Sequence, residues 1–116
     1  MQLESFIKDV TETESEFQLL NKGNDLDREV TIPYCCDLLS IAMGRMPQGA
    51  AWVTVMANTN ALAVASLAEA ACIILAEGSK LDEPDIAKAK EKGITILISE
   101  LPVFECALSV YKRLND

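Results

Sequence analysis

The sequence predicts one three-layer α/β/α domain, in which a mostly parallel sheet of about five strands lies between helices. Three strand–turn–helix units follow one another through residues 51–114. Strands that alternate with helices favour a parallel sheet with helices packed on its faces. The length of 116 residues suits a single domain with its own core, and no linker or low-complexity segment divides it. We therefore expect residues 1–116 to form one unit.

The C-terminal half has the clearest local signals. The expected strands are 51–56, 71–76 and 94–98, and the helices that follow them are 61–70, 83–92 and 102–114. Helix 83–92 has Asp82 as its N-cap, Pro84 in its first turn and Gly93 as its stop. In the last helix we expect one set of apolar side chains to face the sheet: Phe104, Ala107, Leu108, Tyr111 and Leu114.

The N-terminal half is predicted from shorter patterns. Residues 3–10 have apolar side chains at helical spacing, and residues 17–20 and 30–32 are typical of short strands joined by a polar loop. Residues 36–43 are predicted to form a helix that ends at Gly44.

The helix predicted at 61–70 carries apolar or small side chains on all sides between Ala61 and Ala68. Such a helix should be covered on more than one side. A second copy of the chain would provide this cover, which predicts a homodimer. The alternative is that the N-terminal helix or the N-terminal hairpin covers it.

Charge excludes two classes of partner. The chain has 10 basic and 18 acidic residues, a net charge of −8, and no basic stripe. Nucleic acid and anionic membranes are repelled by such a surface. No stretch approaches the ~20 apolar residues of a membrane span, and residues 1–5 lack the features of a signal peptide. We expect a soluble cytoplasmic protein.

The residue types present give little support to catalysis. The chain has no histidine, which removes the commonest general base and a frequent zinc ligand. Its cysteines, Cys35, Cys36, Cys72 and Cys106, include no C-x-x-C pair. We therefore expect reduced thiols, with a Cys35–Cys36 disulfide as the alternative, and neither a metal nor a cofactor.

The turns after the predicted strands indicate where a ligand would bind. Parallel strands bring their carboxyl ends to one edge of a sheet, and open α/β sheets bind ligands there. The polar candidates at this edge are Asn58, Thr59, Asn60, Glu77, Gly78, Ser79 and Ser99. The same amides and hydroxyls are also helix caps, which is the competing explanation for their presence.

Glu77 and Glu100 each follow a predicted strand and define a second possibility. Two carboxylates at one edge can perform acid–base chemistry or hold a divalent cation. Glutamates next to helix N-termini are also stabilised by the helix dipole alone.

Several short segments occur in a fixed order along most of the chain: Leu26 to Val30, Tyr34, Asp37 to Ser40, Trp52 to Thr54, Asn60, Ala63 to Ala65, Ile73 and Ile74, Lys90 to Ile94, and Phe104. With this order and spacing, the chain resembles the DRTGG-domain family. The resemblance implies an α/β/α domain related to the N-terminal domain of HPr kinase/phosphorylase. It also implies regulation, since related copies are attached to phosphate acetyltransferases and CBS-domain proteins.

This chain departs from the family pattern at the expected ligand edge. The threonine–glycine–glycine of the family corresponds to Ala76-Glu77-Gly78, and Asn58 stands where close relatives have histidine. A ligand of the family, above all an anionic one, therefore does not transfer directly to this member.

These observations predict a non-catalytic regulatory or small-ligand-sensing domain that acts through a homodimer or a partner protein. Two alternatives stay open at this stage. One is a small enzyme or divalent-metal site that uses Glu77 and Glu100, and the other is a pure assembly module without a ligand.

Overall fold

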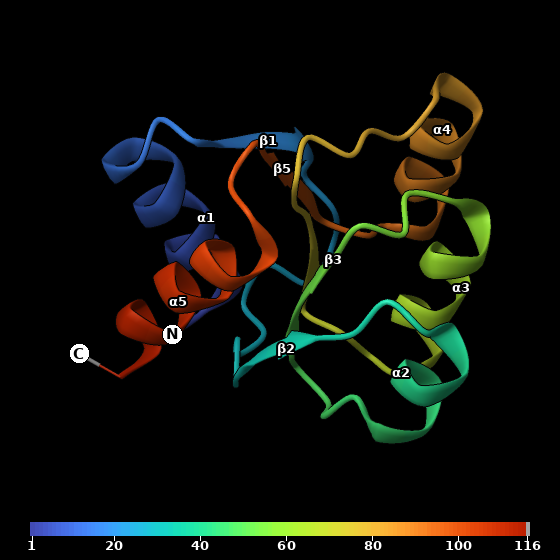
Figure 1. The fold of residues 1–116 in the computed structure, drawn as a ribbon, viewed down its shortest axis with the longest axis horizontal. Coiled ribbons are helices and arrows are strands. Elements are labelled where there is room, and N and C mark those ends of the chain that lie inside the picture. The colour runs from blue at the N-terminus through green and yellow to red at the C-terminus, as the bar shows by residue number, and fades with distance from the viewer. Residues whose placement is uncertain (116) are drawn as a thin grey trace.

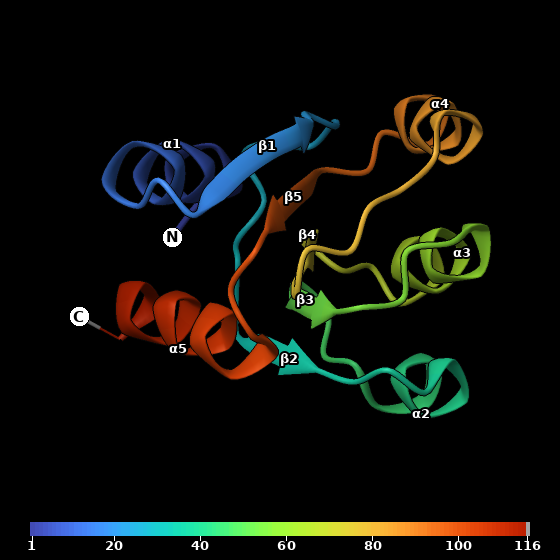
Figure 2. The same ribbon diagram turned by 45° about the horizontal axis from the view of Figure 1, so that its top comes forward.

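A five-stranded sheet in the order β1-β5-β4-β3-β2 separates two layers of helices (Figure 1). The computed structural model describes residues 1–115. Its elements are α1 (Leu3–Thr13), β1 (Phe17–Asn21), β2 (Pro33–Cys35), α2 (Leu39–Arg45), β3 (Ala51–Thr54), α3 (Thr59–Leu67), β4 (Cys72–Leu75), α4 (Glu83–Lys92), β5 (Ile96–Ser99) and α5 (Val103–Leu114). Helices α1 and α5 cover one face, and α2, α3 and α4 cover the other (Figures 1 and 2). The predicted three-layer α/β/α fold is confirmed.

Four of the five strands are parallel. β2, β3, β4 and β5 pair in parallel, and only β1 runs antiparallel, with Phe17 opposite Ser99 of β5. The carboxyl ends of the parallel strands therefore share one edge, which we call the carboxyl edge. The antiparallel direction of β1 brings the start of that strand to the same edge.

Alternation along the strands builds two separate cores. In β3, Trp52 packs with the core on the side of α2, α3 and α4, whereas its neighbour Val53 packs on the side of α1 and α5. Ile73 and Ile74 of β4 divide in the same way. Successive side chains of a strand point to opposite faces, so an unbroken apolar strand serves both layers at once.

The strand predicted at 30–32 is wrong. Val30 is buried and its backbone N–H donates to Met1 O (2.8 Å). Next to it, Glu29 forms an isolated antiparallel β-bridge with Gln2. The N-terminus thus engages Val30, whereas Thr31 N donates to Gly49 O and Ile32 O accepts from Ala51 N. β2 starts later, at Pro33. The hairpin with β1 is also wrong, because β1 and β2 lie at opposite edges of the sheet.

The helix predicted at 36–43 is displaced along the chain. α2 starts at Leu39 because the Asp37 carboxylate accepts hydrogen bonds from β3, which leaves the residue before the helix extended. Gly44 lies inside the helix and does not end it. The helix ends at Arg45 because the next residue, Met46, precedes Pro47 and is extended, as the residue before a proline tends to be.

The predicted sheet face of the last helix is wrong in part. Phe104 and Tyr111 are exposed, at 68% and 54%. The side that packs into the core is formed by Val103, Cys106, Ala107, Val110 and Leu114. The predicted and the observed sets of apolar residues lie on overlapping sides of this helix. Contacts with α1 fix the rotation of α5 and so decide which set faces the sheet. In one of them, Arg113 Nε donates to Asp9 Oδ2 (2.7 Å).

One of the two expectations for the cover of helix α3 is wrong, because neither the N-terminal helix nor an N-terminal hairpin lies over it. It packs on the sheet between α2 and α4, whereas α1 lies on the opposite face (Figure 2). Its buried residues are Ala61, Leu62 and Ala65, and only Leu67 among its large apolar side chains is strongly exposed. Within the chain, α2 and α4 flank α3 in place of the predicted N-terminal helix or hairpin. Cover of this helix by a second copy stays a prediction.

Candidate functional site

The chain leaves the sheet in two directions at the carboxyl edge. β4 leads to α4 on one face, and the adjacent β5 leads to α5 on the other face (Figure 2). Adjacent strands whose exits diverge form the crevice where open α/β sheets bind ligands. The two exits are residues 76–82, between β4 and α4, and residues 100–102, between β5 and α5.

Backbone hydrogen bonds tie the two exits together. Glu77 N donates to Leu101 O (2.8 Å), and Gly78 N donates to Ser99 O (3.0 Å). Glu77 and Gly78 both have left-handed backbone conformations, with φ of 60° and 75°. A Cβ on Gly78 would meet only the end of the flexible Glu100 side chain, which can move aside, so the positive φ and not the available space favours glycine here. The two exits therefore form one hydrogen-bonded floor.

A cavity of about 270 Å³ opens beside this floor. Its lining residues come from the start of β1 and from the ends of β4 and β5: Ser15, Glu16, Gln18, Gly78, Ser79, Lys80, Ile98, Ser99 and Glu100. Three of the seven predicted ligand residues, Gly78, Ser79 and Ser99, line it. Ser99 is buried, and its Oγ accepts a hydrogen bond from Leu101 N (3.1 Å), so one lone pair of this hydroxyl is occupied.

The other predicted turn serves helix α3. Asn58 Oδ1 accepts a hydrogen bond from Ala61 N (2.9 Å), which is the cap predicted for this helix. Thr59 Oγ1 is hydrogen-bonded to the Asp85 carboxylate of α4 and accepts from Lys88 Nζ (3.2 Å). Asn58, Thr59 and Asn60 are not among the residues that line the 270 Å³ cavity.

The cap can be tested directly. We expect Asn58→Ala to lower the free energy of unfolding by about 1 kcal/mol, because it removes the acceptor of an otherwise unpaired helix N–H. Asn58→Asp retains an acceptor and should leave stability nearly unchanged. Urea denaturation of the three proteins provides the measurement, and an Asn58→Ala protein as stable as the wild type would contradict the assignment.

Glu77 and Glu100 have different surroundings. Glu77 Oε2 accepts a hydrogen bond from Val103 N (3.0 Å) and so caps α5, whose preceding residue Pro102 contributes no side-chain cap. Glu100 lines the cavity and packs against Gly78. Within residues 1–115, no group of three or more His, Cys, Asp or Glu side chains has the arrangement of a metal site.

Asp37 is a polar residue at the carboxyl edge that was not predicted as part of the site. Its Oδ1 accepts from Thr54 Oγ1 (2.7 Å) and from Val55 N (2.9 Å). Trp52 Nε1 donates to Cys36 O (2.9 Å) next to it. These bonds hold the loop after β2 against the end of β3. The signal available in the sequence was Thr54, a polar residue at the end of an otherwise apolar buried strand.

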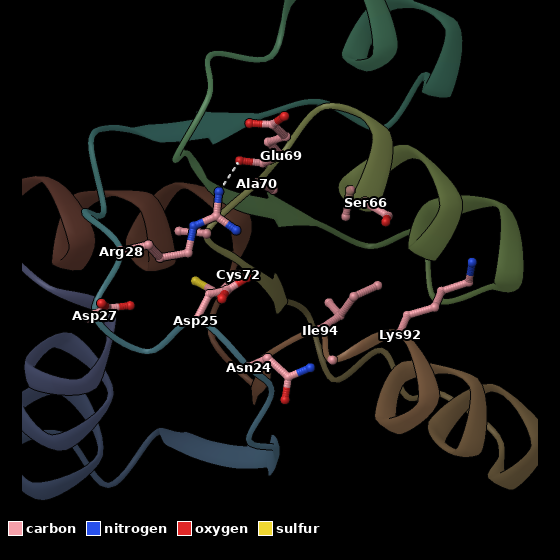
Figure 3. A pocket seen from close by; sticks show the side chains of 13 residues that line it. Asn24, Asp25, Asp27, Arg28, Ser66, Glu69, Ala70, Cys72, Lys92 and Ile94 are labelled. Atoms are coloured by element: carbon pink, nitrogen blue, oxygen red, sulfur yellow. Dashed lines mark hydrogen bonds between the residues drawn. The ribbon is translucent and has the colours of Figure 1, made fainter.

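A larger cavity, of about 450 Å³, lies at the opposite edge of the sheet (Figure 3). The ends of α3 and α4 and the loop before β2 enclose it, and Arg28 Nη2 donates to Glu69 O (2.8 Å) across its wall. At its base, burial raises the pKa of the Cys72 thiol to about 12, so this thiol stays protonated at neutral pH. All four cysteines are free thiols.

The charges around the larger cavity are mixed. Asp25, Asp27 and Glu69 lie with Arg28 and Lys92, and the C-terminal ends of α3 and α4 add negative dipole ends. No motif in the sequence predicted it. Residues 1–115 contain no helix with the length and apolar character needed to cross a membrane.

Comparison with known proteins shows similarity at the level of the fold. No protein-family model matches the sequence, and no curated protein matches it. A similar solved structure is that of the CBS and DRTGG domains of the regulatory region of Clostridium perfringens pyrophosphatase, complexed with the activator diadenosine tetraphosphate. The TM-score is 0.73 at 13% identity, over 88% of this chain and 44% of that chain. This chain therefore spans less than half of the similar chain, and the likeness supports a DRTGG-like fold.

Proposed function

We propose that this chain is a non-catalytic regulatory domain of the DRTGG family that senses a small molecule at the carboxyl edge. One observation carries the proposal: a cavity of 270 Å³ opens beside the exits of β4 and β5, and Gly78, Ser79 and Ser99 are among the residues that line it. The fold of a regulatory region that binds an activator supports the same class of function. The domain would act in the cytoplasm as a homodimer or with a partner protein.

The lining of the cavity restricts the ligand. Hydroxyl groups of Ser15 and Ser79 and the amide of Gln18 suit a polar, hydrogen-bonding molecule. Two carboxylates, Glu16 and Glu100, outnumber the single ammonium of Lys80, so a polyphosphate is disfavoured. The volume of about 270 Å³ lies just below the range of ligand pockets, which is roughly 300–1,000 Å³. We expect a small neutral or cationic ligand.

An enzyme that uses Glu77 and Glu100 on one substrate atom is less well supported. One oxygen of the Glu77 carboxylate, Oε2, accepts a hydrogen bond from Val103 N at the start of α5, and Glu77 is not among the residues that line the cavity. General acid–base catalysis needs both groups within hydrogen-bond reach of the reacting atoms.

The proposal is tested by a thermal-shift screen with nucleosides, nucleotides, acyl-coenzyme A species, nicotinamides, polyamines and divalent metals. A binder raises the melting temperature by mass action. Isothermal titration calorimetry of the hit then compares Ser79→Trp, which fills the carboxyl-edge cavity, with the matched Ser66→Trp, which lies in the wall of the 450 Å³ cavity.

We expect Ser79→Trp to abolish binding and Ser66→Trp to retain it. The reverse result would move the site to the opposite edge of the sheet and overturn the proposed location. Turnover of the bound compound would overturn the non-catalytic assignment. No shift with any compound would favour the assembly module.

A further inference from the structure

A long part of this acidic chain is nearly free of charge. Between Thr31 and Ala68 only Asp37 and Arg45 are charged, although charged residues make up 24% of the sequence. This part contains β2, α2, β3 and α3. The Asp37 carboxylate is moreover engaged with Thr54 and Val55.

Exposed apolar side chains gather around the same part of the molecule. Six of the large apolar residues with substantial exposure are Ile32, Leu38, Ile41, Met43, Phe104 and Tyr111. The first four lie on the segment that leads into β2, on the loop after it and on α2, and the last two lie on α5. We call these six residues the edge surface.

The elements that carry the edge surface flank one edge of the sheet. β2 is the last strand in the sheet order, and no other strand between residues 1 and 115 pairs with its outer side. Helix α5 packs on β2 and β3 from one face, and α2 lies on the other face (Figures 1 and 2). The edge surface therefore extends across all three layers.

The orientation of α5 directs its exposed residues away from α1. Ser109 and Arg113 contact α1 through Glu14 and Asp9. Phe104 and Tyr111 lie about half a turn around the helix from these residues, given 3.6 residues per turn. They point to the side of α5 that no other helix of residues 1–115 covers.

We infer that a second copy of this chain covers the edge surface in a two-fold dimer. The inference concerns the homodimer of the proposed function and is independent of the ligand. Two copies that each carry a charge of −8 repel each other. The part of the edge surface within residues 31–68 lowers this repulsion because its one carboxylate, Asp37, is engaged within the chain, whereas on α5 Glu105 follows Phe104. Depletion of charge and enrichment in aromatic residues and Met are typical of homodimer interfaces.

The size of this end of the molecule is sufficient. The molecule measures 33 × 27 × 27 Å, and its longest dimension runs across the three layers (Figure 1). An interface of the roughly 800 Å² per partner that stable complexes bury would therefore use most of this end of the molecule.

Side chains, and not sheet extension, would hold the two copies. Ala51 N donates to Ile32 O, so the alternating backbone groups of Pro33 and Cys35 point outward from β2. Pro33 has no N–H to offer a partner strand. The apolar side chains on α2 and α5 remain as the main source of contact.

Sedimentation velocity of the full chain over a range of concentrations tests the inference. We expect a wild-type dimer, and we expect Phe104→Glu and Ile41→Glu each to raise the dimer dissociation constant by at least about tenfold. The matched control Leu67→Glu changes an exposed leucine on α3, which is 70% exposed, and should leave the dimer intact. Far-UV circular dichroism of each variant confirms folding, since all three side chains are exposed.

A wild-type monomer at every soluble concentration would overturn the inference, even if the protein binds a ligand as proposed. Dissociation by Leu67→Glu with a stable Phe104→Glu dimer would also overturn it and place the interface on α3. Loss of ligand binding in Ser79→Trp together with an unchanged dimer leaves the inference standing, so the two proposals fail separately.

Discussion

Replacing Gly23 with alanine is expected to cost on the order of 3 kcal/mol or more of folding free energy, because two backbone segments meet at this glycine. A Cβ at position 23 would lie 2.6 Å from the carbonyl carbon of Gly93 and 2.7 Å from that of Ile94, and closer still to Gly93 O. Backbone atoms cannot rotate aside as a side chain can. The shift would also break the bonds of Gly23 N to Thr95 Oγ1 (3.0 Å) and of Asn24 N to Gly93 O (2.9 Å).

The matched control is Gly44→Ala. Gly44 lies inside α2, its φ is ordinary, and a Cβ there would meet nothing within 4 Å. Alanine in a helix interior is favoured over glycine by roughly 0.5–1 kcal/mol. We therefore expect opposite signs for the two variants in urea denaturation monitored by circular dichroism. A Gly23→Ala protein as stable as the wild type would show that the two segments can separate without cost.

The contact at Gly23 also illustrates which parts of the fold a sequence can predict. Helix 83–92 was predicted with its correct bounds because its cap, proline and terminal glycine all lie within the helix or next to it. The three apolar strands of the C-terminal half were predicted within two residues at each end, because a run of apolar residues is also a local signal. Gly23 and Gly93, in contrast, lie far apart in the chain, and no local pattern announces that they touch.

The N-terminal half was predicted less well because its order depends on long-range bonds. The N-terminal residues Met1 and Gln2 hold 29–30, and Asp37 holds the loop before α2 against β3. Neither arrangement has a periodicity that could be recognised. The side of α5 that faces the sheet is a related case. Two overlapping sets of apolar residues fit the helical period, and only the contacts with α1 decide which set is buried.

The candidate site depends partly on local sequence patterns and partly on long-range contacts. Gly78, Ser79 and Ser99 were predicted from the parallel βα pattern alone. Glu16 and Gln18 were missed because their position depends on the antiparallel direction of β1, which the sequence does not specify. Asn58 was assigned correctly as a cap, and its place in a binding site stays a prediction.

Trp52→Ala is expected to lower the free energy of unfolding by about 3–5 kcal/mol, since it removes a fully buried aromatic side chain from β3. Trp52→Phe separates packing from hydrogen bonding: it keeps most of the volume but leaves Cys36 O without its donor, at a cost of roughly 1–3 kcal/mol. Circular dichroism is the suitable probe of unfolding because the substitutions remove Trp52, the sole tryptophan, and with it the tryptophan fluorescence.

The structural change in Trp52→Phe should be largest in the loop after β2, which Cys36 and Asp37 hold against β3. The cavity beside β4 and β5 should keep its shape. Trp52→Phe is therefore expected to weaken the dimer more than the ligand complex, and the opposite order would contradict this division of the carboxyl edge.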